Sequence, residues 1–173
     1  AVITGIGALT PLGINGPSFH QALIEGKSGV RGITSFDASG LPIRFGGCIP
    51  DFDAKNYVDK KDRKALRVMA KTIQLAVSGA QCAINDSKVD KEKLDRTRFG
   101  VIFGAGLIAS ELNELADAAV VSSSGDPIKV DLDVWGHKGL EVIQPLWMLK
   151  YLPNMLACQV SILHDAQGPN NSI

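Results

Sequence analysis

A glycine-rich turn is the feature of this sequence with the clearest potential for chemistry. Gly104, Gly106 and Ala109 follow an apolar run and precede a helical pattern, and Asp126 comes at about the span that a dinucleotide-binding fingerprint needs. Backbone N–H groups in such a turn can hold a pyrophosphate. Small residues also let a chain turn tightly after a strand. The residues alone leave a dinucleotide-binding oxidoreductase domain and a plain structural turn equally open.

Three cysteines, Cys48, Cys82 and Cys158, are the candidate nucleophiles. Their odd number, wide spacing and apolar neighbours favour reduced thiols in the core over a disulfide framework, and therefore a cytoplasmic location. Cys158 lies in an apolar helical pattern, where exclusion of water makes a thiol a poor nucleophile. We expect none of the three to be catalytic.

The three histidines do not indicate a metal site. His20, His137 and His164 are isolated from each other and from any cysteine pair, so no metal-ligand spacing is present, and we expect each at the surface or in a turn. No serine lies in a Gly-x-Ser-x-Gly motif, which removes the simplest hydrolase. The sequence predicts no metal and, unless the glycine turn binds a dinucleotide, no cofactor.

Basic residues at helical spacing provide the strongest local charge. If a helix already begins at residue 60, one of its faces carries Lys60, Lys64, Arg67 and Lys71. The whole chain has 18 Lys and Arg against 18 Asp and Glu, and this zero net charge gives no general attraction to nucleic acid or to a membrane surface. The stripe predicts docking of an acidic protein, and the simpler alternative is a solvated helix face.

The elements that must position these residues alternate between strands and helices. With 173 residues and 45% hydrophobic content, the chain can form one domain that buries roughly 70% of its unfolded surface. No run approaches the roughly 18 apolar residues of a membrane helix. The alternation predicts an α/β layered fold with parallel strands. The expected elements are a buried strand over 1–4, a helix over 17–25, a strand over 43–49, a long helix over 65–84, a strand over 99–103, helices from 112 to 119 and from 153 to 163, and a final strand after 169.

Motifs rich in glycine and proline extend along nearly the whole chain. They are VITGIGALTPLG at 2–13, EGKSG at 25–29, FDASG at 36–40, FGVIFGAG at 99–106, LPNM at 152–155, QVSI at 159–162 and GPNNSI at 168–173. In this order they resemble the N-terminal part of the elongating β-ketoacyl-acyl-carrier-protein synthases of the thiolase superfamily. The resemblance is weakest over 122–150, which has no clear period and is expected to be an insertion or a cap.

The resemblance implies a thiolase-like layered α/β fold, with a mostly parallel or mixed sheet flanked by helices, in one truncated domain over 1–173. It implies a decarboxylative Claisen condensation in fatty acid or polyketide synthesis. The family's nucleophilic cysteine and two histidines come after the position of Ile173, so no catalytic residue is expected in this chain, and the fragment alone is expected to be inactive. Residues 164–167 (HDAQ) depart from the family pattern, which leaves open a non-catalytic partner of the chain-length-factor type.

The same resemblance assigns roles to three groups of residues. Leu107 and Ile108 correspond to the lining of the family's acyl tunnel. The stripe from Lys60 to Lys71 lies near the surface that docks an acyl carrier protein. A homodimer, or a synthase-like heterodimer, is expected to form through a strand that contains Gly168, Pro169, Asn170, Asn171, Ser172 and Ile173.

Overall fold

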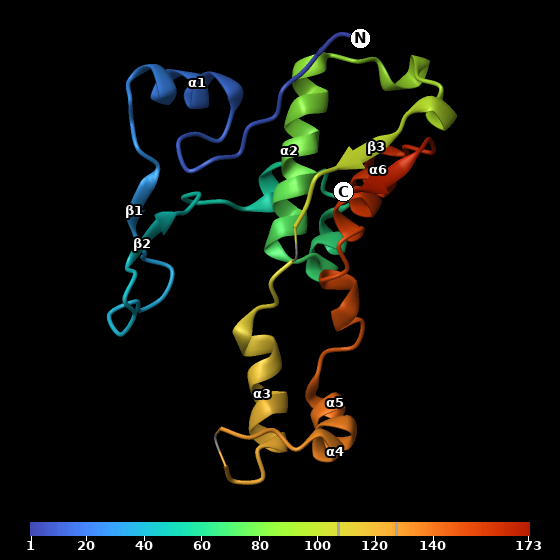
Figure 1. Cartoon of the computed structure of the whole chain (residues 1–173). Helices are drawn as coiled ribbons and strands as arrows, with labels where there is room; N and C mark the ends of the chain where they lie inside the picture. The colour runs from blue at the N-terminus through green and yellow to red at the C-terminus, as the bar shows by residue number, and fades with distance from the viewer. Residues whose placement is uncertain (107, 127) are drawn as a thin grey trace.

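The computed structural model describes residues 1–106, 108–126 and 128–173, and Figure 1 shows their arrangement. Its helices and strands are α1 (Gly16–Ile24), β1 (Val30–Gly32), β2 (Phe45–Gly47), α2 (Lys71–Ser87), β3 (Val101–Phe103), α3 (Leu112–Ser122), α4 (Leu132–Val134), α5 (Leu140–Val142), α6 (Met155–His164) and β4 (Asn170–Ser172). Short 3₁₀ turns form η1 (Ala54–Asn56), η2 (Arg63–Val68), η3 (Lys91–Lys93), η4 (Arg96–Arg98) and η6 (Trp147–Lys150), and a π-helical turn forms η5 (Trp135–Gly139).

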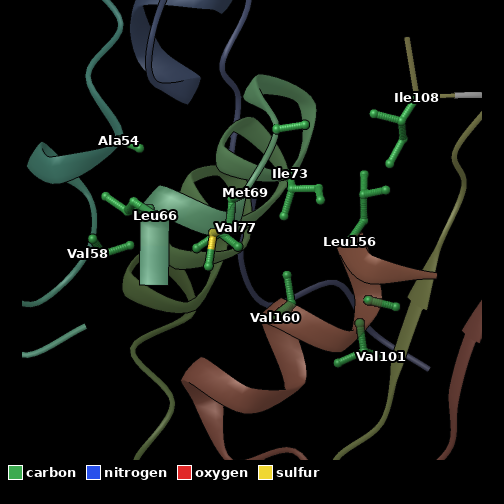
Figure 2. Close-up of a cluster of buried hydrophobic side chains, with 12 residues drawn as sticks. Ala54, Val58, Leu66, Met69, Ile73, Val77, Val101, Ile108, Leu156 and Val160 are labelled. Atoms are coloured by element: carbon green, nitrogen blue, oxygen red, sulfur yellow. The ribbon is translucent and has the colours of Figure 1, made fainter. Parts of the chain in front are cut away.

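The core lies where α2 packs against α6 (Figure 2). Ile73 and Val77 of α2 and Ala157 of α6 are completely buried. Apolar residues at three- and four-residue spacing along α2 place these side chains on one face, as the sequence pattern predicts. The small side chain of Ala157 allows the two helices to approach closely.

The strands predicted over 99–103 and after residue 169 are both present, as β3 and β4, and they pair in parallel. In β3 and β4, Val101 is opposite Asn170 and Phe103 is opposite Ser172, and α6 packs on both strands. A side chain at Gly168 would place its Cβ 2.8 Å from the carbonyl oxygen of Phe99, so only glycine permits this close approach of the two segments.

The N-terminal part agrees with the sequence prediction only in places. Helix α1 forms as expected, because Asn15 caps it by accepting a 2.8 Å hydrogen bond from the backbone N–H of Ser18. The strand expected over 43–49 is reduced to β2, which pairs antiparallel with the unpredicted β1. The described strands therefore form two separate two-stranded sheets, one parallel and one antiparallel.

The buried strand expected over 1–4 is wrong. Val2 and Ile3 are 85% and 86% exposed, and neither belongs to a strand. A strand needs a neighbour that satisfies its backbone groups, and no described segment pairs with residues 1–4. The chain approaches α2 just afterwards: a Cβ at Gly7 would lie only 2.0 Å from the carbonyl oxygen of Gly79.

Between residues 122 and 150, the described residues 132–142 and 147–150 are helical. Turns α4, η5 and α5 pack against α3 and form an arm that extends away from the core helices (Figure 1). Asp131 begins this run of turns, because its carboxylate accepts hydrogen bonds from the N–H groups of Asp133 and Val134 at 3.0 and 3.1 Å.

The completely buried Val77 gives a test of the core. Val77→Ala should lower the free energy of unfolding by about 2 kcal/mol, because it removes apolar area and leaves a cavity. Val120→Ala makes the same change at a helical position that is 71% exposed, and should cost less than about 0.5 kcal/mol. Urea unfolding of both variants measures the difference, and equal losses would contradict this description of the core.

Candidate functional site: a basic hollow beside the buried core

The basic residues do not form one helical stripe. Lys64 and Arg67 lie in η2, Lys60 lies in the turn before it, and Lys71 is the first residue of α2. The expectation of a continuous helix from Lys60 is therefore wrong. Between η2 and α2 the chain is extended, with φ −111° and ψ 126° at Met69.

Two features explain the break before α2. Met69 is 3% exposed and Leu66 is 8% exposed, so both side chains join the core. The side-chain amide of Gln74 donates hydrogen bonds to the carbonyl oxygens of Leu66 and Met69, at 3.3 and 3.0 Å. These bonds satisfy carbonyl groups that a continuous helix would otherwise pair.

Because of this break, some of the basic residues line a hollow of about 460 Å³. Lys64 and Arg67 line it, whereas Lys60 and Lys71 are absent from its described lining. Its other polar walls are Asp53, Lys55, Arg63 and Gln74. The sequence pattern does not identify Lys55, because this residue lies outside the helical spacing. Only the packing of η1 against η2 brings Lys55 to the hollow.

The predicted acyl-tunnel residues have different outcomes. Leu107 lies outside the described residues. Ile108 is 6% exposed and belongs to the cluster that contains Val101 and Leu156 (Figure 2). Its place in the core is compatible with packing and with contact to a bound chain, so its role stays a prediction.

The glycine turn does not have the geometry of a dinucleotide site. The described residues between β3 and α3 are not helical, and α3 begins only at Leu112. The fingerprint needs a helix N-terminus directly at its glycines, because that terminus faces the pyrophosphate. Gly104, Gly106 and Ala109 therefore lack the element that would bind such a cofactor.

A polar cluster that the sequence does not reveal joins α3 to η6. Lys150 Nζ donates to one carboxylate oxygen of Glu114 at 2.6 Å, and the hydroxyl of Tyr151 donates to the other at 2.7 Å. Burial acts to raise the pKa of Glu114, but the hydrogen bonds from Lys150 and Tyr151 and the charge of Lys150 outweigh it and lower the pKa. The Tyr151 oxygen also accepts a bond from the backbone N–H of Glu111 at 3.3 Å, which fixes the start of α3.

His164 is buried, and its expected place at the surface or in a turn is wrong. It is the last residue of α6 and 3% exposed, with Nδ1 3.1 Å from Lys91 Nζ. Burial, together with the nearby positive charge of Lys91, lowers the pKa of His164 to about 4. The ring is therefore neutral at physiological pH.

The cysteines are only partly as expected. All three are free, but Cys48 is exposed, so it is not a core thiol. Cys82 and Cys158 are partly buried, and burial raises the pKa of the Cys82 thiol. Within the described residues, no group of three or more His, Cys, Asp or Glu side chains could hold a metal ion.

Within the predicted strand segment Gly168–Ile173, β4 covers Asn170–Ser172, so the strand is confirmed over these three residues. One edge of β4 pairs with β3. In the part of the chain that the structure describes, no strand pairs with its other edge. Its place at a dimer interface stays a prediction.

A model of the family described as "Beta-ketoacyl synthase, N-terminal domain" matches residues 1–173. The chain belongs to this family. It is 35% identical over 170 residues to the 3-oxoacyl-[acyl-carrier-protein] synthase 2 of Synechocystis sp., covering 98% of this chain and 36% of that relative. The chain thus spans little more than a third of the length of this relative.

Solved structures of ketosynthases share its fold. The ishigamide ketosynthase/chain length factor superposes with a TM-score of 0.74 at 21% identity, over 99% of this chain and 39% of the other. One chain in the structure of a type II PKS acyl-carrier protein in complex with its ketosynthase superposes with a TM-score of 0.60 at 19% identity, over 96% of this chain and 39% of the other. These likenesses show the thiolase-like α/β fold. No helix of the described residues is long and apolar enough to cross a membrane.

The buried His164 should make stability depend on pH. Its pKa is about 4 in the folded chain and 6.5 in the reference state, so the unfolded chain binds the proton more readily between these values. The stability that the neutral His164 contributes is fully present above about pH 6.5 and is lost as the pH falls toward 4. At about 1.4 kcal/mol per pH unit the loss has an upper limit of about 3.5 kcal/mol, and water near the ring reduces it.

Urea unfolding between pH 7 and pH 4 measures this loss. His164→Gln should flatten the dependence, whereas His20→Gln, at an exposed position, should retain it. A slope that is unchanged by His164→Gln would show that other groups cause the dependence.

Proposed function

We propose that this chain is the N-terminal part of a 3-oxoacyl-[acyl-carrier-protein] synthase, which condenses an acyl group with a malonyl group on an acyl carrier in fatty acid or polyketide synthesis. The observation that carries the proposal is the match of the family model to residues 1–173. In this family pattern the nucleophilic cysteine and the two histidines follow the position of Ile173, so this chain supplies no catalytic residue and is inactive alone.

A non-catalytic partner of the chain-length-factor type is the second candidate. It is favoured by the departure from the family pattern at residues 164–167, where the sequence is HDAQ. Such a partner keeps the fold and the dimer surface but lacks the downstream cysteine. Either protein would work in the cytoplasm, as the three free thiols suggest.

The dimer of this proposal forms through Gly168–Ile173, as a homodimer or as a heterodimer with a related synthase. Its support is the second edge of β4, which has no partner strand among the described residues. Open strand edges pair readily with another strand, and a twofold copy of the same strand can supply one.

The carrier docks at the basic surface of Lys60, Lys64, Arg67 and Lys71. All four are exposed, and within the described residues none of them forms an ion pair. Such a surface speeds the encounter with an acidic protein, and added salt weakens the attraction. A fold neighbour was solved as an acyl-carrier protein in complex with its ketosynthase.

The condensation can be tested together with the proposed role of Ile108 in the acyl tunnel. Given acyl carriers of increasing chain length and malonyl carrier, the full-length protein should release 3-oxoacyl thioesters, which mass spectrometry detects. Ile108→Phe should shorten the longest chain accepted, because a larger side chain fills space that the acyl chain needs.

The condensing function and the role of Ile108 can be refuted independently of each other. If the full-length protein gives no product with any acyl length, the condensing function is wrong and the non-catalytic partner is favoured. If Ile108→Phe lowers the thermal midpoint but leaves the product lengths unchanged, Ile108 is a packing residue only.

The docking surface can be tested by charge reversal in the full-length protein. Lys64→Glu with Arg67→Glu should weaken binding of the carrier by at least about tenfold at low salt and flatten its salt dependence. The pair Lys60→Glu and Lys71→Glu makes the same change in charge outside the hollow and should weaken binding less. Wild-type affinity in the first pair would refute the docking site, and equal losses in both pairs would show that the whole four-residue surface, and not the hollow, attracts the carrier.

A further inference from the structure

The hollow between η1, η2 and α2 contains more positive charge than the chain itself neutralises. Lys55, Arg63, Lys64 and Arg67 surround it, and Asp53 is the one acid in its described lining. Within the described residues, none of the four cations forms a salt bridge. Like charges this close repel one another, and a bound anion would relieve that repulsion.

Arg63 retains unused hydrogen-bond donors at this place. Its Nη2 donates to the carbonyl oxygen of Lys55 at 2.8 Å, which ties η2 to η1 and fixes the guanidinium. Its Nε is buried and has no hydrogen-bond partner in the described chain. A buried N–H without a hydrogen-bond partner is unfavourable, and a ligand oxygen that pairs with it removes this cost.

The backbone around the hollow and the guanidinium of Arg63 are held in place before any ligand arrives. The Arg63 bond to Lys55 fixes one side, and the two bonds from Gln74 to the carbonyls of Leu66 and Met69 fix the other. Leu66 and Ala54 lie buried beneath the two 3₁₀ turns. A site that is already formed loses less conformational entropy on binding than a flexible one.

We propose that this hollow is a binding site for a phosphate group. Four cations suit a phosphate monoester, which carries nearly two negative charges at neutral pH, better than they suit a single carboxylate. A guanidinium also matches the geometry of phosphate oxygens. The volume of about 460 Å³ leaves room for the group to which the phosphate is esterified.

The phosphate site shares Lys64 and Arg67 with the proposed docking surface but does not depend on it. It adds Lys55 and Arg63 and leaves out Lys60 and Lys71. The phosphate has two possible sources, a small phosphate ester in solution or the phosphate on the prosthetic arm of a carrier protein. Both present the same chemistry to the hollow.

The first experiment uses inorganic phosphate and no carrier. The thermal midpoint of the full-length protein is measured in phosphate and in sodium chloride at equal pH and ionic strength, because a ligand that binds only the folded state raises the midpoint. Equilibrium dialysis with labelled orthophosphate gives the dissociation constant. We expect phosphate to raise the midpoint and to bind at one saturable site.

Matched variants locate the site. Lys64→Gln with Arg67→Gln should weaken phosphate binding by at least about tenfold, whereas Lys60→Gln with Lys71→Gln, which removes the same charge outside the hollow, should leave it within about twofold. All four side chains are exposed, so both pairs are expected to fold. No saturable binding by the wild type, or equal loss in both pairs, would overturn the proposal.

A competition experiment then identifies the source. Holo-carrier, which has the phosphate-bearing arm, and apo-carrier, which lacks it, are added to the phosphate-bound protein. Because the carrier is itself proposed to dock on Lys64 and Arg67, both forms can displace phosphate, and the concentration that each form needs is compared. Displacement at a much lower concentration of holo-carrier than of apo-carrier supports the site and assigns it to the carrier arm, and displacement by neither supports it as a site for a free phosphate ester. Equal displacing concentrations of the two forms would overturn the carrier arm as the occupant and assign the competition to acidic side chains of the carrier.

Discussion

Burial of one face of α2 is the constraint on which the rest of this structure depends. Ile73 and Val77 have no contact with solvent, and α6 covers them with the small side chain of Ala157. Because α6 is fixed in this way, the parallel pair β3–β4 that packs on it is fixed as well. The N-terminal segment approaches α2 through Gly7, so elements from both ends of the chain are arranged around one helix (Figure 1).

The same burial explains why α2 begins where it does. Leu66 and Met69 also contribute to the core, and the extended backbone between η2 and α2 allows both side chains to reach it. Gln74 satisfies the carbonyl groups that are left free by the break. As a result, basic residues that a continuous helix would spread along one face instead line a hollow together with Lys55. The demands of the apolar core therefore determine the shape of a charged surface.

The Glu114 cluster has a comparable role at the other end of the core. It joins α3 to η6 by two hydrogen bonds at 2.6 and 2.7 Å, and Tyr151 packs against the core cluster that contains Ile108. Because Lys150 is 14% exposed and Glu114 is 21% exposed, the pair is better shielded from water than a surface salt bridge. The base of the helical arm and the segment that follows Ile108 are thus held by the same polar group.

Local sequence signals were enough to identify the family, the α/β alternation, and most of the helices and strands. Helices α1, α3 and α6 and strand β3 follow from turn residues, periodicity and apolar runs, all of which act between near neighbours. Strand β4, with the sequence Asn-Asn-Ser, follows from the turn before it and from the family resemblance. The exposed segment 1–4, the burial of His164 and the Glu114–Lys150 pair depend on contacts between residues far apart in the sequence. The meeting of Lys64 and Arg67 with Lys55 in a hollow could not be predicted, because helical spacing describes one regular element and cannot show where packing of the core interrupts it.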